Sequence, residues 1–273
     1  MSFEACAELV RVGDPDRFLS VMAAPEDARA RLFALYAFNL EVARAPWVTK
    51  EEMIAEMRLQ WWLDAINEIY EGKVRHHEVV EALAEVIGTY SLPQLLFTDL
   101  IQARRFDIYR ESHPDRTSFD DYIAATAGNL MSLAAMSLGA EGARSNVIAD
   151  FGYAVGIGNL FRALPVLYVN GRHPVPVDCA LDRNAVAGGE VPDNLRHSLL
   201  EIATAAQSKV AMARSRRTEV PQSALPAMLV GWQVDTPLVM VRRQPSEALR
   251  LPLETSEFQK KLSLLWRSST GRW

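Results

Sequence analysis

One segment constrains the fold of this chain more than any other. Residues 152–176 are mostly apolar, yet they include Asn159 and Arg162. These two residues are three positions apart, so in a helix their side chains share one face. A guanidinium in an apolar helix is costly unless it is paired or faces water. We therefore expect a helix whose polar face meets a cavity or a buried partner.

Apolar residues recur at helical spacing through most of the chain, and no stretch alternates as a strand would. On the second helix they predict a buried face of Ile54, Met57, Trp61, Ala65 and Ile69. Small residues around Gly128 predict a close approach between helices. Eight or nine helices make an all-α bundle, which we expect to be one domain over residues 1–273 with a core of about 14–267. The expected helices span about 25–45, 50–70, 78–88, 93–110, 119–138, 145–169, 195–216, 224–241 and 256–266, with an irregular connection over 170–192.

Composition excludes several classes of protein. The net charge of −5 gives no overall attraction to nucleic acid. The two cysteines, Cys6 and Cys179, are far apart, which argues against a disulfide framework or a zinc site and suits a reducing compartment. The amino-terminal residues lack the pattern of a signal peptide. We expect a cytoplasmic protein without nucleic-acid partners.

Two features bear on membrane contact. No run of about 18 apolar residues is uninterrupted, so we expect no transmembrane helix. Residues 224–241 come nearest; a buried helix and turn is the favoured interpretation, and they are also the best candidate for peripheral docking on the inner membrane face. Basic residues cluster at 214–217 and 242–243. We interpret both clusters as solvated surface, with an acidic partner or anionic lipid as the alternative.

Common catalytic motifs do not occur. The sequence contains no GxSxG, HExxH or Walker motif. Acidic pairs at helical spacing, Glu52 with Glu56 and Asp64 with Glu68, lie mainly away from the apolar face predicted for their helix. A solvated surface is therefore favoured over a magnesium site there.

Four segments together resemble the squalene/phytoene synthase superfamily. They are Phe-Ala-Leu-Tyr-Ala-Phe at 33–38, Leu-Gln-Trp-Trp-Leu-Asp at 59–64, residues 122–128, and residues 152–176. They occur in the family's order, and the resemblance covers about residues 14–240. It implies an isoprenoid-synthase-like helical bundle with a central cavity, in which the enzymes join two prenyl diphosphates head to head. Those enzymes hold magnesium ions between two aspartate-rich motifs on facing helices.

In this chain the motif aspartates are replaced without insertion or deletion. The first pair falls on Ala43 and Trp47, and the second pair falls on Ala163 and Leu167. Gly156 stands at the family's glutamine. Asn159 and Arg162 match retained family residues, and Asp107 stands where the family tends to carry an aspartate.

The loss of all four carboxylates changes the expected chemistry. Nothing at these positions would anchor the magnesium ions that offset the charge of a diphosphate. We therefore expect no magnesium at the family sites and no catalytic residues. Asn159, Arg162 and Asp107 become candidates for a remnant ligand or anion pocket. Alternatively, Asn159 and Arg162 are a buried polar pair that fixes helix packing.

Within the superfamily, the chain resembles most the branch that contains a mitochondrial complex I assembly factor. This resemblance rests on residues 37–41, Met57 to Trp61, and Arg162 to Pro165. The resemblance implies a non-catalytic binding or assembly role, with respiratory complex I subunits or another membrane protein as partners. Two alternatives stay open. One is a divergent prenyltransferase that uses Asp107, Glu41 and Asp64; the other is a protein that binds an isoprenoid or quinone.

Overall fold

The computed structural model describes residues 2–140, 146–177, 185, 186, 188, 190–249 and 256–273. Within these ranges the chain is an all-α bundle without strands, as predicted. Cys179 lies outside the described residues. The main helices are α1 (Ser2–Gly13), α2 (Pro15–Met22), α3 (Glu26–Arg44), α4 (Glu52–Tyr70), α5 (Glu78–Tyr90), α6 (Gln94–Arg104), α7 (Phe106–Tyr109), α8 (Arg116–Ile123), α9 (Asn129–Ser137), α10 (Asn146–Val169), α12 (Asp193–Ser215), α13 (Leu225–Met228), α14 (Asp235–Arg243) and α15 (Glu257–Thr270).

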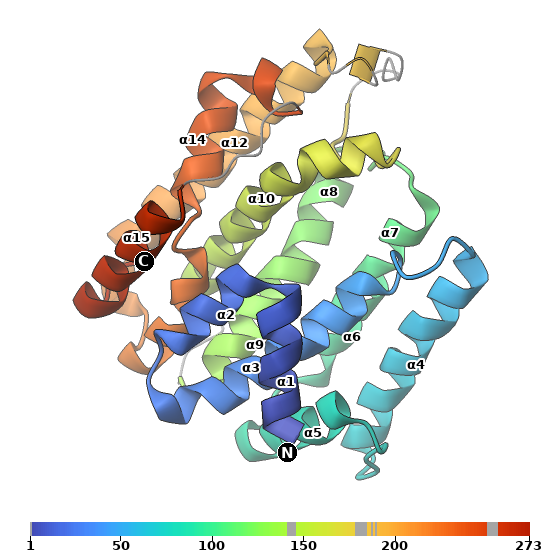
Figure 1. Cartoon of the computed structure of the whole chain (residues 1–273), viewed down its shortest axis with the longest axis vertical. Helices are drawn as coiled ribbons and strands as arrows, with labels where there is room; N and C mark the ends of the chain where they lie inside the picture. Colours follow the sequence, from blue (N-terminus) through green and yellow to red (C-terminus); the bar gives the residue numbers. More distant parts are fainter. Residues whose placement is uncertain (1, 141–145, 178–184, 187, 189, 250–255) are drawn as a thin grey trace.

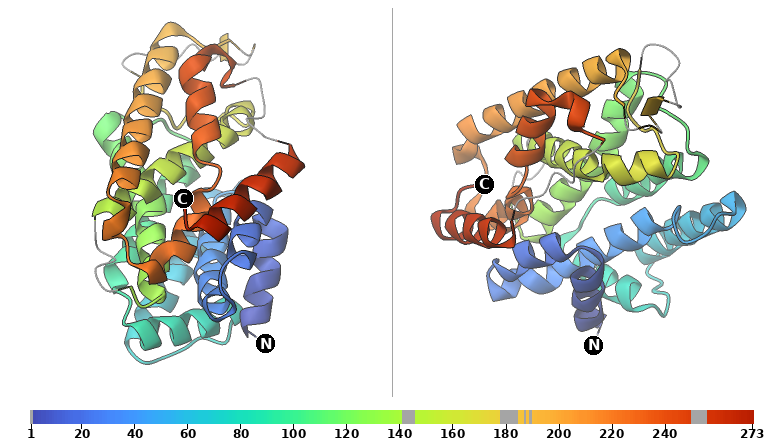
Figure 2. Two further views of the ribbon diagram at one scale, coloured as in Figure 1. Left: turned by 90° about the vertical axis from the view of Figure 1, so that its left-hand side faces the viewer. Right: turned by 45° about the horizontal axis from the view of Figure 1, so that its top comes forward.

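Helix α10, which contains residues 152–169 of the apolar segment, runs through the middle of the bundle. Helices α12, α14 and α15 lie on one side of it, and α4 forms the opposite edge (Figure 1). The two further views in Figure 2 show the same arrangement, with α1 and α2 lying against α3. By length and composition α10 could span a membrane, but 61% of its most apolar window is buried inside the bundle. A core helix of a large bundle has this composition.

A close crossing fixes the position of α10. The helix packs against a π-helical segment, η1 (Ala124–Gly128), that joins α8 to α9. A Cβ atom added to Gly152 would lie 2.6 Å from the Cβ of Met131 and 3.0 Å from the carbonyl oxygen of Ala127. A Cβ at Gly156 would lie 2.5 Å from the Cβ of Ala127. The predicted close approach near Gly128 is confirmed, and only glycine fits at these two positions.

Several of the predicted helices are interrupted in the structure, and the sequence analysis did not predict the interruptions. The expected helix 93–110 is interrupted at Arg105, and the expected helix 119–138 contains the π-helical segment. The stretch 224–241 divides into short helices, and each of its residues is buried or half-buried. Because these residues are not exposed, the stretch 224–241 cannot be a docking surface. Sequence periodicity does not detect such breaks, because the apolar spacing continues across them.

Two further corrections concern the amino-terminal half. Helices α1 and α2 were not predicted, although Asp14 caps α2 by accepting a hydrogen bond of 3.0 Å from the backbone nitrogen of Arg17. On α4, Ile54 and Met57 are 40% and 65% exposed, so the predicted buried face is wrong at its amino-terminal end. Ala65 is buried as predicted, and Trp61 and Ile69 are partly buried against the core. The residues that α4 buries fully are Ala55, Leu59, Trp62, Ala65 and Ile66.

The crossing of α10 and η1 can be tested by substitution. Gly152→Ala should lower the free energy of unfolding by about 1–2 kcal/mol, because the new methyl group must displace Met131 or backbone atoms. Gly88→Ala on α5 is the matched control, since nothing lies within 4 Å of its added Cβ. Its stability should stay constant or rise, because alanine favours the helix. Urea unfolding measures both; a fully stable Gly152→Ala protein would contradict the crossing.

Candidate functional site

Two adjoining cavities lie between α3 and α10. The first, of about 300 Å³, extends toward α7 and η1. The second, of about 480 Å³, extends toward α2 and α14. They share part of their lining, so they meet at one wall. The residues that line both are Arg17, Asn39, Ala43, Arg104, Asn159 and Ala163.

The structure brings together the four positions that match the family's aspartates. Ala43 and Trp47, at the end of α3 and just beyond it, line the first cavity together with Ala163 and Leu167 of α10. Two methyl groups, an indole and an isobutyl group therefore face the space. None of them can bind a metal ion or carry a proton.

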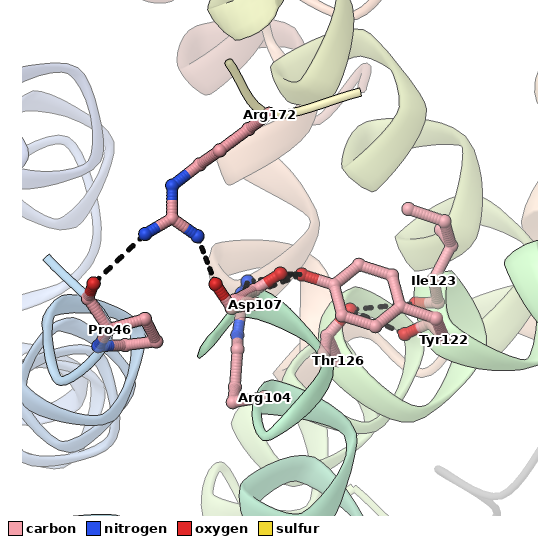
Figure 3. Close-up of polar contacts among 7 residues, drawn as sticks. All are labelled: Pro46, Arg104, Asp107, Tyr122, Ile123, Thr126 and Arg172. Carbon is pink, nitrogen blue, oxygen red and sulfur yellow. Dashed lines mark hydrogen bonds and ion pairs between the residues drawn. The ribbon is translucent and has the colours of Figure 1, made fainter. Parts of the chain in front are cut away.

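Asp107 also lines the first cavity, but its carboxylate is engaged. It accepts hydrogen bonds of 3.1 Å from Arg104 and 3.0 Å from the hydroxyl of Tyr122. Arg104 also donates to the Tyr122 hydroxyl at 2.7 Å, so the three groups form a closed cluster (Figure 3). Burial raises the pKa of Tyr122, so the phenol stays protonated and donates to Asp107. The cluster holds the start of α7 against α8.

Arg172 closes the first cavity from the segment that follows α10. Its guanidinium donates hydrogen bonds to the backbone oxygens of Asp107 and Pro46, the second at 3.0 Å (Figure 3). It also lies 4.2 Å from the ring centre of Trp47, within cation–π range. Trp47 stands at a position where the family resemblance places a metal ligand, and here it packs against Arg172. The contacts tie the ends of α3, α7 and α10 together.

Arg162 does not share the first cavity with Asp107, so the predicted trio is not assembled. It lines the second cavity and forms an ion pair of 2.5 Å with Asp16 of α2, each side chain being 23% exposed. Burial alone would raise the pKa of Asp16, but hydrogen bonds from Arg162 and Gln233 lower it below its usual range. Asn159 lines both cavities. Arg162 is thus a packing residue that joins α10 to α2.

The positions that match the family's metal ligands supply no carboxylate to the first cavity. Among the described residues, no group of three or more histidine, cysteine, aspartate or glutamate side chains is placed to hold a metal ion. The carboxylates along the first cavity are those of Asp107 and Glu111. Glu41 and Asp64, the other candidates for a divergent enzyme, line neither cavity. No candidate carboxylate lines a cavity with Arg162, which weighs against the divergent-enzyme hypothesis.

Sequence reasoning missed Arg17 and Tyr122 as cavity residues. Arg17 forms an ion pair of 3.2 Å with Asp14 and lies 4.9 Å from the ring centre of Tyr36. The pair Asp14-Pro15 is a typical start of a helix, and it could have indicated helix α2, which carries Arg17. Tyr122 falls in a segment quoted for the family resemblance, but its partner Asp107 lies 15 residues away. No spacing rule joins them.

Comparison with known proteins settles the family. The squalene/phytoene synthase family model matches residues 10–257. This chain belongs to the squalene/phytoene synthase family. Its backbone superposes on a ligand-bound dehydrosqualene synthase with a TM-score of 0.80, at 17% identity, covering 98% of this chain and 96% of that one. At that identity the superposition shows the shared fold.

Several relatives of this chain are named as complex I assembly factors, and a more distant one is named phytoene synthase. The human NADH dehydrogenase (ubiquinone) complex I assembly factor 6 is 28% identical over 231 residues, covering 82% of this chain and 69% of its own. The Dictyostelium discoideum homologue of that factor is 25% identical over 253 residues, covering 90% and 71%. The chain therefore combines the fold of a prenyl synthase with similarity to assembly factors.

The ion pair in the second cavity predicts a measurable coupling. A double-mutant cycle of Asp16→Asn and Arg162→Met should give an interaction energy of about 1–3 kcal/mol, because each partner is mostly buried. The folded-state pKa of Asp16 is lowered, so this stability is fully present above the unfolded-state pKa of about 3.9. It is lost as the pH falls through the lower folded-state value.

Urea unfolding at pH 7 and at successively lower pH measures the coupling. The matched control is the cycle on Glu8 and Arg11, an ion pair of 2.6 Å whose side chains are more than half exposed. That cycle should show no measurable coupling. Equal results for the two pairs would show that Arg162 does not fix the packing of α10.

Proposed function

We propose that this protein is a catalytically inactive member of its family and acts as an assembly factor for respiratory complex I. One observation carries the proposal: the positions that match both aspartate-rich motifs line one cavity, and none of them bears a carboxylate. Magnesium-dependent release of diphosphate needs those carboxylates. The names of the relatives supply the assembly role. We expect the protein on the cytoplasmic side of the membrane that houses the complex.

Purified protein should not consume farnesyl or geranylgeranyl diphosphate when magnesium is added. The expected result is the same rate as buffer alone, because the positions that match the family's metal ligands carry no carboxylate. A dehydrosqualene synthase assayed in parallel is the positive control. Magnesium-dependent turnover by this chain would overturn its classification as inactive.

The assembly role needs a separate experiment in the source organism. A tagged copy, isolated from the membrane fraction under mild conditions, should co-purify with subunits of respiratory complex I. Loss of the gene should lower the amount of assembled complex on native gels. Normal assembly without the gene, or a pull-down free of those subunits, would contradict the role while leaving the inactive classification standing.

The cavities also support a second function, the binding of an amphiphile such as an isoprenoid or quinone. The first cavity combines apolar side chains, including Leu130 and Leu160, with polar groups at the shared wall. Arg17 and Arg104 lie on that wall, and the Nε of each is buried and forms no hydrogen bond. A single polar or anionic group could approach the accessible part of either guanidinium while its apolar tail fills the cavity.

Lipid extraction and mass spectrometry of natively purified protein test this binding. The expected result is one retained class of amphiphile, which Ala163→Phe should displace because residue 163 lines both cavities. The control is Val169→Phe, a substitution at an exposed position on the same helix. Retention unaffected by Ala163→Phe, or the absence of any bound lipid, would rule out this second function.

A further inference from the structure

Helix α15 has the reverse of the usual distribution of side chains. Four large apolar residues on it are exposed: Phe258 at 75%, Leu262 at 55%, Leu265 at 65% and Trp266 at 49%. Their spacing of four, seven and eight positions from Phe258 places them in one stripe along the helix. Helices at the surface of a water-soluble protein turn such a stripe toward the core. This one turns it outward.

The face of α15 that meets the bundle carries basic residues. Lys260 is 6% exposed and lies 3.8 Å from a carboxylate oxygen of Asp16. Arg267 lies 2.8 Å from a carboxylate oxygen of Asp235. Leu264 is the large apolar side chain that the helix buries. Ion pairs thus attach the helix to the bundle, and its apolar side chains remain available to a partner.

Positive charge surrounds the carboxyl end of this helix. The guanidinium groups of Arg214, Arg217, Arg267 and Arg272 lie near one another, and Asp235 pairs with two of them. Burial lowers the pKa of Arg217, and the charges of the other three lower it further. Arg272 lies 5.6 Å from the ring centre of the exposed Trp266. Asp235 and the oxygen of Trp273 accept hydrogen bonds from the other three arginines, and the exposed Arg272 favours an anionic partner.

We propose that α15 docks the protein on an anionic lipid bilayer, with Phe258, Leu262, Leu265 and Trp266 inserted into the interface. A helix of 14 residues, with phenylalanine, leucine and tryptophan on one face and lysine and arginine beside them, has the composition of an interfacial helix. Anionic headgroups would meet the arginine cluster. The proposal does not rest on the assembly role.

The charge beside the apolar stripe favours a lipid bilayer over a protein partner. Four side chains with these exposures offer on the order of 500 Å² of apolar surface, about the apolar share of a protein interface of standard size. A protein partner would have to fill this area with complementary pockets. A bilayer needs no such complementarity, because acyl chains adapt to the side chains. The predicted docking stretch 224–241 cannot serve, since its residues are buried or half-buried.

Vesicle flotation with the full chain tests the proposal. Wild-type protein should float with vesicles of phosphatidylcholine and phosphatidylglycerol, and should float less with phosphatidylcholine alone. Leu262→Gln combined with Leu265→Gln should weaken partitioning by on the order of tenfold, because two inserted side chains are lost. The control is Met53→Gln with Met57→Gln on α4, two residues exposed to 75% and 65%. The control variant should float like wild type.

A charge variant and a test of self-association complete the design. Lys261→Glu with Arg272→Glu should abolish the preference for anionic vesicles. Because the substituted side chains are exposed, thermal unfolding of both α15 variants should match wild type. Wild-type protein that does not float, or equal flotation of the leucine variant, would overturn the proposal. So would a wild-type dimer in sedimentation that the leucine variant dissociates, since a second copy would then cover α15.

Discussion

The contact between α10 and the π-helical segment is the constraint on which the rest of the structure depends. Gly152 and Gly156 allow the two backbones to approach more closely than any side chain would permit. That approach sets where Ala163 and Leu167 lie, about two and three turns beyond Gly156 along α10. At Gly156, where the family carries glutamine, a side chain would collide with Ala127. Neither Gly156 nor the four positions that match the metal ligands therefore presents a carboxylate or an amide to the cavity.

Three arginines at the cavities form ion pairs with aspartates of the protein. Arg17 pairs with Asp14, Arg104 with Asp107, and Arg162 with Asp16. In a metal-dependent site, carboxylates would bind magnesium and arginines would bind diphosphate. Here each of these carboxylates forms an ion pair with an arginine, and the pairs hold α2, α7 and α10 in place. A ligand with several negative charges would have to break them, so a ligand with one polar group fits these ion pairs better.

The sequence predicted the all-α fold, most helix positions and the absence of carboxylates at 43, 47, 163 and 167. Those features depend on local spacing and on an ungapped match to a family pattern. The partners of Arg162 and Asp107 could not be predicted, because Asp16 and Tyr122 lie on other helices whose placement no periodicity fixes. The exposure of Ile54 and Met57 at the start of α4 could not be predicted for a related reason. Apolar spacing does not show how far along α4 the core extends.

Asp16 connects the cavity to the surface helix. One of its carboxylate oxygens binds Arg162 of α10, and the other lies 3.8 Å from Lys260 of α15. Lys260 must point inward to reach it, and that orientation places Phe258 and Leu262 on the outer side of the helix. The outward orientation of the apolar stripe therefore depends on Asp16, which also forms the ion pair with Arg162 of α10. Moving α15 away would remove a cation from a mostly buried carboxylate, so the electrostatics of the core hold the helix in its outward-facing position.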